Sequence, residues 1–412
     1  MPIELSGITF TEQGDFVGVS GEEKILNNGF ANTFAGNDLI VGNSENSISS
    51  TQERISGFYN SGTFNTSDGN DIILGTASYD DLIPDTYEYT ISGLHNIGTL
   101  NTGDGNDIIF GIRYKQQKYR ARDSYGNGIF SQGGTIDTGD GDDIISGISE
   151  GFLSRGIEFI SNHAYLERPD TINTGNGNDT ITGTGDETGI EIDSLIDTVD
   201  PIIDTGKGDD LITGIGSYYG LELSSSLNTD DGNDTITGIS SGGYGIFNTG
   251  TLNTGDGNDI ITGIIAYDGD AIFNTGTINT GNGNDIIVGL GSEYPLSGNI
   301  ANTGTINTGN GADSIIADNG FYTTDGNIFL GKGTDYIRGF GSGNVNGGND
   351  QDSLELMSGS YTIEISETIV SFTSYSSNNS GTMITSEFEK LIAGSTTYDF
   401  TSLTNGQTIV VT

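Results

Sequence analysis

The chain contains no cysteine and only two histidines, His95 and His163, among its 412 residues. Disulfides and thiolate chemistry are therefore excluded, and a zinc site or a histidine-based active site lacks its usual residues. The sequence also has no 18-residue apolar run, and its first residues lack the basic and apolar regions of a cleaved signal peptide. We expect a soluble protein that does not use a classical N-terminal export signal.

Basic side chains are scarce, with 13 Lys and Arg against 57 Asp and Glu and a net charge of −44. Because affinity for phosphate comes from Lys and Arg, nucleic acid and anionic membranes are poor partners, and a cation is the expected one. Low hydrophobicity with high charge is also typical of disorder. The order within the sequence argues against disorder here, because one template recurs along most of the chain.

The template is clearest in three consecutive copies, Ile246–Gly263, Ile272–Gly289 and Ile300–Ala317, and earlier copies cover residues 57–75, 93–111 and 128–147. The last Asp of each glycine-rich core recurs after 36, 36, 36, 31, 24, 25, 26, 28 and 22 residues, from Asp71 to Asp335. A constant core with a variable remainder is typical of a solenoid. Single or paired apolar residues between Asn-Thr-Gly turns predict short strands rather than helices.

The predicted fold is all-β, a right-handed parallel β-helix or β-roll solenoid of about ten to twelve coils with a β-rich C-terminal cap. We expect an N-terminal cap over residues 1–30, the repeat solenoid over 31–352 and the C-terminal cap over 353–412. Strands are expected in this cap at residues 361–365, 368–372, 382–385 and 407–411.

Stacked coils bring the aspartates of successive turns to ~4.8 Å from each other. At that distance two carboxylates repel by about 3.5 kcal/mol at an effective dielectric constant of 20. Either the carboxylates point into solvent or a cation lies between the coils. Two glycines in each turn permit positive φ and bring carbonyl oxygens inward. Carbonyl and carboxylate oxygens together predict calcium rather than zinc or magnesium.

The turns resemble the nonapeptide Gly-Gly-x-Gly-x-Asp-x-aliphatic-x of the repeats-in-toxin (RTX, haemolysin-type) calcium-binding family, with Thr usually in place of the first Gly. Phe34, Ser67, Asp230 and Asp350 replace a glycine before the weaker candidates Asp38, Asp71, Asp234 and Asp352. The resemblance implies several Ca²⁺ ions along one edge of a broad coil, perhaps one with three strands. The alternative is that each aspartate only bonds its own turn. The eight complete copies are Gly103, Gly105 and Asp107; Gly139, Gly141 and Asp143; Gly175, Gly177 and Asp179; Gly206, Gly208 and Asp210; Gly255, Gly257 and Asp259; Gly281, Gly283 and Asp285; Gly309, Gly311 and Asp313; and Gly331, Gly333 and Asp335.

The C-terminal runs Ser386–Gly394 and Thr408–Thr412 are similar to the end of RTX proteins, where an uncleaved type I secretion signal resides. A capping β-structure without an export role is the alternative, and the two are compatible. The resemblance implies an extracellular or cell-surface protein exported by a type I system.

We expect a secreted structural, matrix or adhesion protein that folds on binding calcium outside the cell, with glycans, matrix proteins or further copies as partners. No catalytic motif is present, so no enzymatic activity is expected. One alternative is a polysaccharide lyase or epimerase, for which Arg155, Glu158 and Arg168 are scattered candidates. The other is ice binding through repeated Asn-Thr pairs, Asn248/Thr249, Asn274/Thr275 and Asn302/Thr303.

Two features stand apart from the repeat. The segment Arg113–Arg122 holds five of the thirteen basic residues, and it either contacts an anionic glycan or partner protein or pairs with the acidic body of the chain. His95 takes the place that Phe has in sister copies, so a packed ring is expected, whereas His163 has no partner motif.

Overall fold

The computed structural model describes residues 2–18, 24–46, 54–79, 90–115, 126–151, 153–161, 170–194, 200–291, 299–317, 319–322, 326–375 and 380–412. The chain divides into two compact units, Met1–Thr229 and Asp230–Thr412. Apart from two 3-10 helices, Leu5–Gly7 (η1) and Phe400–Ser402 (η2), every regular element in these ranges is a strand. No helix in them is long and apolar enough to cross a membrane. The predicted all-β solenoid is confirmed, whereas the predicted division at residues 30 and 352 stays a prediction.

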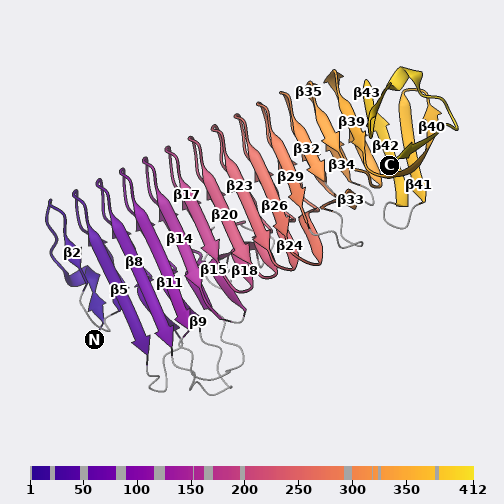
Figure 1. Cartoon of the computed structure of the whole chain (residues 1–412). Helices are drawn as coiled ribbons and strands as arrows, with labels where there is room; N and C mark the ends of the chain where they lie inside the picture. Colours follow the sequence, from indigo (N-terminus) through magenta and orange to yellow (C-terminus); the bar gives the residue numbers. More distant parts are fainter. Residues whose placement is uncertain are drawn as a thin grey trace. The chain divides into compact units, whose positions relative to one another are not determined.

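In the first unit the chain passes through three parallel sheets in turn, and each repeat adds one strand to each sheet (Figure 1). Sheet A contains β1 (Ile3–Glu4), β3 (Ile25–Asn27), β6 (Arg54–Asn60), β9 (Thr90–Asn96), β12 (Gly126–Gln132), β15 (Ser154–Ser161), β18 (Thr188–Ser194) and β21 (Tyr219–Leu223). Sheet B contains β2 (Phe16–Val17), β5 (Leu39–Asn46), β8 (Ile72–Tyr79), β11 (Ile108–Lys115), β14 (Ile144–Ser149), β17 (Thr180–Thr184) and β20 (Leu211–Gly216). Sheet C contains β4 (Phe30–Asn32), β7 (Thr63–Asn65), β10 (Thr99–Asn101), β13 (Thr135–Asp137), β16 (Thr171–Asn173), β19 (Ile202–Asp204) and β22 (Ser226–Asn228).

The second unit repeats this arrangement. Sheet A contains β24 (Gly243–Asn248), β27 (Gly269–Asn274), β30 (Ile300–Asn302) and β33 (Phe321–Tyr322). Sheet B contains β23 (Thr235–Ser240), β26 (Ile260–Ile265), β29 (Ile286–Leu290), β32 (Ser314–Ala317), β36 (Tyr336–Arg338), β39 (Ser353–Leu356), β43 (Lys390–Ala393) and β44 (Thr396–Asp399). Sheet C contains β25 (Thr251–Asn253), β28 (Thr277–Asn279), β31 (Thr305–Asn307), β34 (Asn327–Phe329), β37 (Gly343–Asn346), β42 (Ser380–Ser386), β41 (Ile369–Tyr375), β40 (Gly359–Ser366) and β45 (Thr408–Val411), and β35 (Lys332–Gly333) pairs with β38 (Asn349–Asp350).

The last sixty residues change the pairing. Strands β42, β41, β40 and β45 pair in antiparallel fashion, as do β43 and β44. These strands cover the four segments expected from the sequence. Strands β39 and β43, however, still pair in parallel, so the solenoid pattern continues into this region.

The core is a set of columns of identical or similar aliphatic residues, one column from each sheet. In sheet C of the first unit, Leu100, Ile136 and Ile172 lie in register and are fully buried. In sheet B, Ile109, Ile145 and Ile181 form a second such column. Each coil alone buries few side chains, so stacking supplies most of the apolar contact that holds the fold.

Buried asparagines form a ladder inside the coils beside sheet A. The Asn248 Nδ2 donates to Asn274 Oδ1 and the Asn274 Nδ2 donates to Asn302 Oδ1, both at 2.7 Å. The first unit has the same ladder through Asn27, Asn60 and Asn96. The predicted surface position of Asn248, Asn274 and Asn302 is wrong, because these residues are fully buried and their amides bond one another inside the coils. Only Thr249, Thr275 and Thr303 of those pairs are exposed.

The outlying residues are partly placed. His95 is fully buried, and its ring contacts Tyr59 and Phe130 at centroid distances of 5.3 and 4.8 Å, as expected. Arg113 is also fully buried and donates to Ser149 Oγ and the Glu150 carbonyl, so the first residue of the basic segment is an interior one. Residues 116–122 of that segment, together with His163 and Arg168, lie outside the described residues.

Candidate functional site

The predicted metal turn joins sheet C to sheet B in every repeat. In the copy at residues 101–108, Asn101 faces outward, Thr102 faces inward, residues 103–106 make the turn and Asp107 faces inward again. The structure therefore brings all predicted aspartates together in one buried column per unit. The first-unit column contains Asp38, Asp71, Asp107, Asp143, Asp179 and Asp210, and the second-unit column contains Asp234, Asp259, Asp285, Asp313, Asp335 and Asp352.

The turn glycines are required by both conformation and space. All sixteen glycines of the eight complete copies have positive φ; for example, φ is 84° at Gly103 and 145° at Gly105. Successive turns stack so closely that a Cβ atom on Gly141 would lie 1.9 Å from the carbonyl oxygen of Gly105. The carbonyl oxygens of the turn glycines therefore face the equivalent glycines of the next turn along the stack.

Gly141→Ala is expected to lower the free energy of unfolding by roughly 2–4 kcal/mol, because the methyl group meets backbone that cannot move without separating two coils. Urea unfolding followed by circular dichroism measures the effect. Gly7→Ala is the matched control, since an added Cβ there has no atom within 4 Å. Equal stability of the two variants would contradict the tight stacking of the turns.

The four incomplete copies carry a non-glycine residue in the same left-handed conformation. The φ angles are 63° at Phe34, 63° at Ser67, 55° at Asp230 and 88° at Asp350. A side chain in this region costs about 1–2 kcal/mol relative to a right-handed backbone. The turn therefore keeps the same backbone conformation in these four copies, although the non-glycine residue is strained.

Phe34→Gly is expected to raise the free energy of unfolding by about 0.5–1 kcal/mol, the relief of strain less the extra entropy of glycine. Phe34 is 46% exposed, so little apolar burial is lost. Phe30→Gly is the control, because Phe30 is also exposed but lies in strand β4 and shows no positive φ. Chemical denaturation should show a gain for the first variant and a loss for the second.

One oxygen of each carboxylate is bonded to the neighbouring coil. The backbone N–H of Asp71 donates to Asp107 Oδ1 at 2.7 Å, and that of Asp107 donates to Asp143 Oδ1 at the same distance. The second unit continues the pattern from Asp234 to Asp352 at 2.8 to 2.9 Å. The predicted aspartates therefore hold successive coils together through Oδ1, whatever binds at Oδ2.

The second oxygen, Oδ2, has two kinds of environment. In some coils the inward threonine donates to it, as Thr174 does to Asp179 and Thr254 to Asp259, both at 2.6 Å. In others the threonine hydroxyl donates to a carbonyl of the next coil, as Thr66 does to Thr102 at 3.1 Å. Beside Asp107 and Asp143, the hydroxyls of Thr102 and Thr138 have no hydrogen-bond partner among the described residues. In the same part of the chain seven buried Oδ2 atoms accept no hydrogen bond: those of Asp71, Asp107, Asp143, Asp285, Asp313, Asp335 and Asp352.

Burial raises the pKa of these carboxyl groups. It raises the pKa of Asp71 to about 7, of Asp143 to about 8 and of Asp335 to about 7, with neighbouring carboxylates adding to the rise. The column therefore favours either protonated carboxyls or a bound cation at neutral pH.

The donor set fits calcium at the coils with an unpartnered Oδ2. The candidate ligands at these turns, carboxylate and backbone carbonyl groups, are oxygen donors, which suit Ca²⁺. At Asp335 and Asp352 the inward threonine is replaced by Leu330 and Gly347, so no hydroxyl stands beside the carboxylate. Coils such as those of Asp179 and Asp259 fit less well, because the threonine already satisfies the carboxylate. Within the described ranges no three acidic or histidine side chains converge as a metal cluster, so backbone oxygens would have to complete each site.

The outer face of sheet B is the second candidate site, and the sequence analysis did not identify it. Alternate residues of its strands point outward, and the first three of them on each strand from β5 to β29 are aliphatic residues, threonines or other uncharged side chains. Ile144 is 37% exposed, Leu211 41% and Ile260 39%. The outward positions in the first unit are Leu39, Val41 and Asn43; Ile72, Leu74 and Thr76; Ile108, Phe110 and Ile112; Ile144, Ser146 and Ile148; Thr180, Thr182 and Thr184; and Leu211, Thr213 and Ile215. Those in the second unit are Thr235, Thr237 and Ile239; Ile260, Thr262 and Ile264; and Ile286, Val288 and Leu290.

None of these positions on β5 to β29 carries a charge, although the chain has 70 charged residues. Toward the end of the second unit the outer face of sheet B changes, because β36 and β39 place Tyr336, Arg338 and Glu355 outward and β43 places Lys390 there. Neighbouring strands keep strict register, so Ile260 lies beside Ile286 and Thr262 beside Val288. Figure 1 shows β5, β8, β11 and β14 side by side and running in one direction. Sheet C presents a narrower outer face of two residues per strand, mostly Thr and Asn, which Asp137 and Asp204 interrupt.

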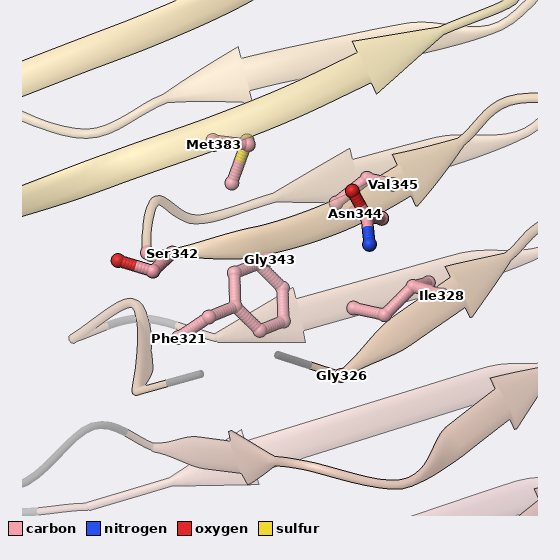
Figure 2. A pocket seen from close by; sticks show the side chains of 9 residues that line it. Phe321, Gly326, Ile328, Ser342, Gly343, Asn344, Val345 and Met383 are labelled. Carbon is pink, nitrogen blue, oxygen red and sulfur yellow. The ribbon is translucent and has the colours of Figure 1, made fainter. Parts of the chain in front are cut away.

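A pocket in the second unit is not a candidate site. Figure 2 shows Phe321, Ile328, Val345 and Met383 around it. It has room for about one water molecule and offers that water few polar partners.

No protein-family model matches the chain, and no curated protein matches it. Among solved structures, a hyperactive, Ca²⁺-dependent, β-helical antifreeze protein from an Antarctic bacterium aligns with 98% of this chain and 95% of its own. The identity is 16% and the TM-score is 0.41. Similarity at this level does not extend the neighbour's activity to this chain.

Proposed function

We propose that the protein acts outside the cell and adsorbs to ice through the outer face of sheet B. The observation that carries this proposal is the composition of that face from β5 to β29, where the first three outward positions of each strand hold mostly methyl and hydroxyl groups and no charge, on a chain of net charge −44. Exposed apolar patches of this extent mark a binding surface. Charged side chains would hold their hydration water too tightly for that water to join a crystal lattice.

The regularity of the face favours a periodic ligand over an irregular one. In-register parallel strands place equivalent side chains ~4.8 Å apart along the stack, and residues two apart on one strand lie ~6.6 Å apart. Surfaces that bind proteins or glycans are usually rich in aromatic residues and arginines. On the described parts of β5 to β29, the outward aromatic residues are Phe110 and Tyr114, both on β11. The surface of an ice crystal is also periodic, and it suits a face of uncharged methyl and hydroxyl groups.

Calcium has a supporting role in this proposal. Ions between successive turns would neutralise the aspartate column and add to the Oδ1 hydrogen bonds that join the coils, so that the regular face is more stable when they are bound. The seven unpartnered Oδ2 atoms and the excess of acidic side chains support this assignment. The matrix or adhesion role, the type I export route and the absence of enzymatic activity stay predictions.

The experiment is to grow a single ice crystal in a solution of the purified protein with calcium. Facets or hexagonal pits, together with a gap between the melting and freezing temperatures, are expected. An unrelated acidic protein at equal concentration is the control. Smooth discs and no temperature gap at every protein concentration would overturn the proposal.

A further inference from the structure

The second-unit aspartate column ends at a turn that is built differently from the repeat turns. In the last repeat, six residues, 347–352, join β37 of sheet C to β39 of sheet B. Between β42 and β43 only three residues make the same connection, and we call Glu387–Glu389 the cap turn. Strand β42 pairs with β37 and β43 pairs with β39, so the cap turn stacks on the turn at residues 347–352.

Glu389 takes the place of the next aspartate in the column. The backbone N–H of Asp352 donates to Glu389 Oε2 at 2.8 Å, just as that of Asp335 donates to Asp352 Oδ1 at 2.9 Å. Phe388 is 6% exposed and stacks on Phe400 at a centroid distance of 5.7 Å, which holds the cap turn from inside. The column therefore ends on a carboxylate that the sequence analysis did not identify.

The second carboxylate oxygen of Asp352 faces the place of a missing side chain. Asp352 is fully buried, and its Oδ2 accepts no hydrogen bond from the described residues. Gly347 occupies the position of the inward threonine of most other copies, so no threonine hydroxyl stands beside this oxygen. A Cβ atom on Gly347 would lie 3.0 Å from Asp352 Oδ2 and would also meet the carbonyl oxygen of Glu387. Two acceptor oxygens therefore border this place.

A strained backbone brings the second of these oxygens inward. Glu387 has a φ of 57°, a left-handed conformation that is unfavourable for a residue with a side chain. Its side chain is exposed, whereas its carbonyl is directed at Gly347. Strained residues of this kind cluster at binding sites, where the surrounding structure holds them in place. The negative charges of Glu389, Asp350 and Glu387 also act on Asp352, so the place lies in a negative field.

A divalent cation supplies what this place lacks. Two carboxylates and one carbonyl are hard oxygen donors, which suit Ca²⁺, and Ca²⁺ takes waters as its remaining ligands. A single proton on Asp352 would neutralise that residue and leave Glu389 charged. No third acidic side chain converges with these two in the part of the chain that the structure describes, so the carbonyl is needed as a ligand.

We propose that a calcium ion binds between the last repeat turn and the cap turn, held by the carboxylates of Asp352 and Glu389 and by the Glu387 carbonyl. The ion joins β43 to β39 and so fastens the C-terminal strands to the solenoid. This inference rests on the calcium role proposed above, and it adds a site with two ligands outside the glycine-rich repeat. It also gives a structural role to part of the run Ser386–Gly394.

Hydrogen–deuterium exchange of the full chain, in calcium and in EDTA, tests this site separately from the rest of the column. Calcium at about ten times its Kd should slow exchange of the β43 amides about tenfold. Glu389→Gln and Asp352→Asn should each lose most of this protection. Glu364→Gln, an equal charge change at an exposed residue of β40, should retain it.

Both test variants are expected to fold, because their amide oxygens still accept the N–H bonds of Asp352 and Asp335. Exchange in EDTA that matches the parent protein verifies this point. Equal protection of β43 in Glu389→Gln and in the parent overturns the site. So does equal protection by magnesium, because neutralisation of charge would then explain it.

The same measurement separates this site from the calcium role of the column. Protection by calcium at the turns before Asp259 and Asp285, without protection of β43, overturns this inference alone. No protection by calcium anywhere in the chain overturns both the site and the column's calcium role.

Discussion

In the absence of calcium, the protein is expected to melt at a higher temperature at about pH 5 than at about pH 8. Burial raises the pKa of the column aspartates from 3.8 to about 7 at Asp71 and about 8 at Asp143. A carboxyl with a raised pKa binds its proton more tightly when folded. Its contribution is therefore complete below about pH 4 and is lost as the pH rises through about 6 to 8.

The expected size of this effect is large. Between about pH 5 and about pH 7, one carboxyl whose folded pKa is about 7 loses roughly 3 kcal/mol of its contribution, at about 1.36 kcal/mol per pH unit. That corresponds to a difference of about 10 °C in melting temperature for units of this size. Calorimetry in EDTA across this pH range measures it. A melting temperature that rises with pH in EDTA would show that the aspartates are not buried as ionisable groups.

Asp143→Asn isolates the column from the general charge of the chain. The amide keeps the Oδ1 acceptor that the Asp107 N–H uses, and it carries no charge. The variant should be more stable than the parent at pH 8 in EDTA and should lose part of the pH dependence. Asp142→Asn is the matched control, because the carboxylate of Asp142 lies next to Asp143 in the sequence but is exposed.

Calcium should reverse the ranking of these proteins. A ligand that binds only the folded state stabilises by RT ln(1 + [L]/Kd), so millimolar calcium should raise the melting temperature of the parent at pH 8. Asp143→Asn should gain less than Asp142→Asn, because it lacks one of the unpartnered oxygens. If calcium raised the melting temperature equally in both variants, or did not raise that of the parent, the column would not be a calcium site. The expected pH dependence in EDTA would be unaffected.

The repeat made the fold predictable from sequence. Identical residues at a fixed place in each copy have to stack, so the position of Asp107 above Asp71 and below Asp143 follows from alignment alone. The three short strands per repeat follow from the apolar pairs and turns. The inward direction of Asn248 does not follow from the sequence. Stacked asparagines can bond one another inside a coil, as they do here, or lie on its surface, and the sequence pattern is the same in both cases.

The outer face of sheet B depends on information that the repeat hides. The outward positions of sheet B look like ordinary strand residues, and their significance appears only when alternation shows that Ile260, Thr262 and Ile264 point to solvent. Glu158, Glu191 and Glu222 share one register position on β15, β18 and β21, where sister copies have His95 or Phe130, so alignment could have revealed this row of glutamates. The position of Arg155 relative to Glu191 depends on strand register 36 residues apart, which composition and motif searches do not supply.

Thr262→Lys is expected to abolish ice shaping without unfolding the protein. Thr262 lies between Ile260 and Ile264 on β26, in the middle of the uncharged face of the second unit. An ammonium group pressed against a solid surface loses hydration without gaining a partner, at a cost of several kcal/mol. Since about 1.4 kcal/mol is tenfold in affinity, the gap between melting and freezing should fall below about one tenth of its value in the parent protein.

The control for this variant is Thr249→Lys, which adds the same charge at an exposed turn residue away from sheet B. Both lysines reduce the net negative charge equally, so a general effect of charge would appear in both proteins. Selective loss in Thr262→Lys assigns adsorption to sheet B. Loss in Thr249→Lys alone would instead place the ice-binding surface beside the turn between sheets A and C. In that case the charge-free composition of sheet B would need another periodic partner, of which a second copy of the chain is the simplest.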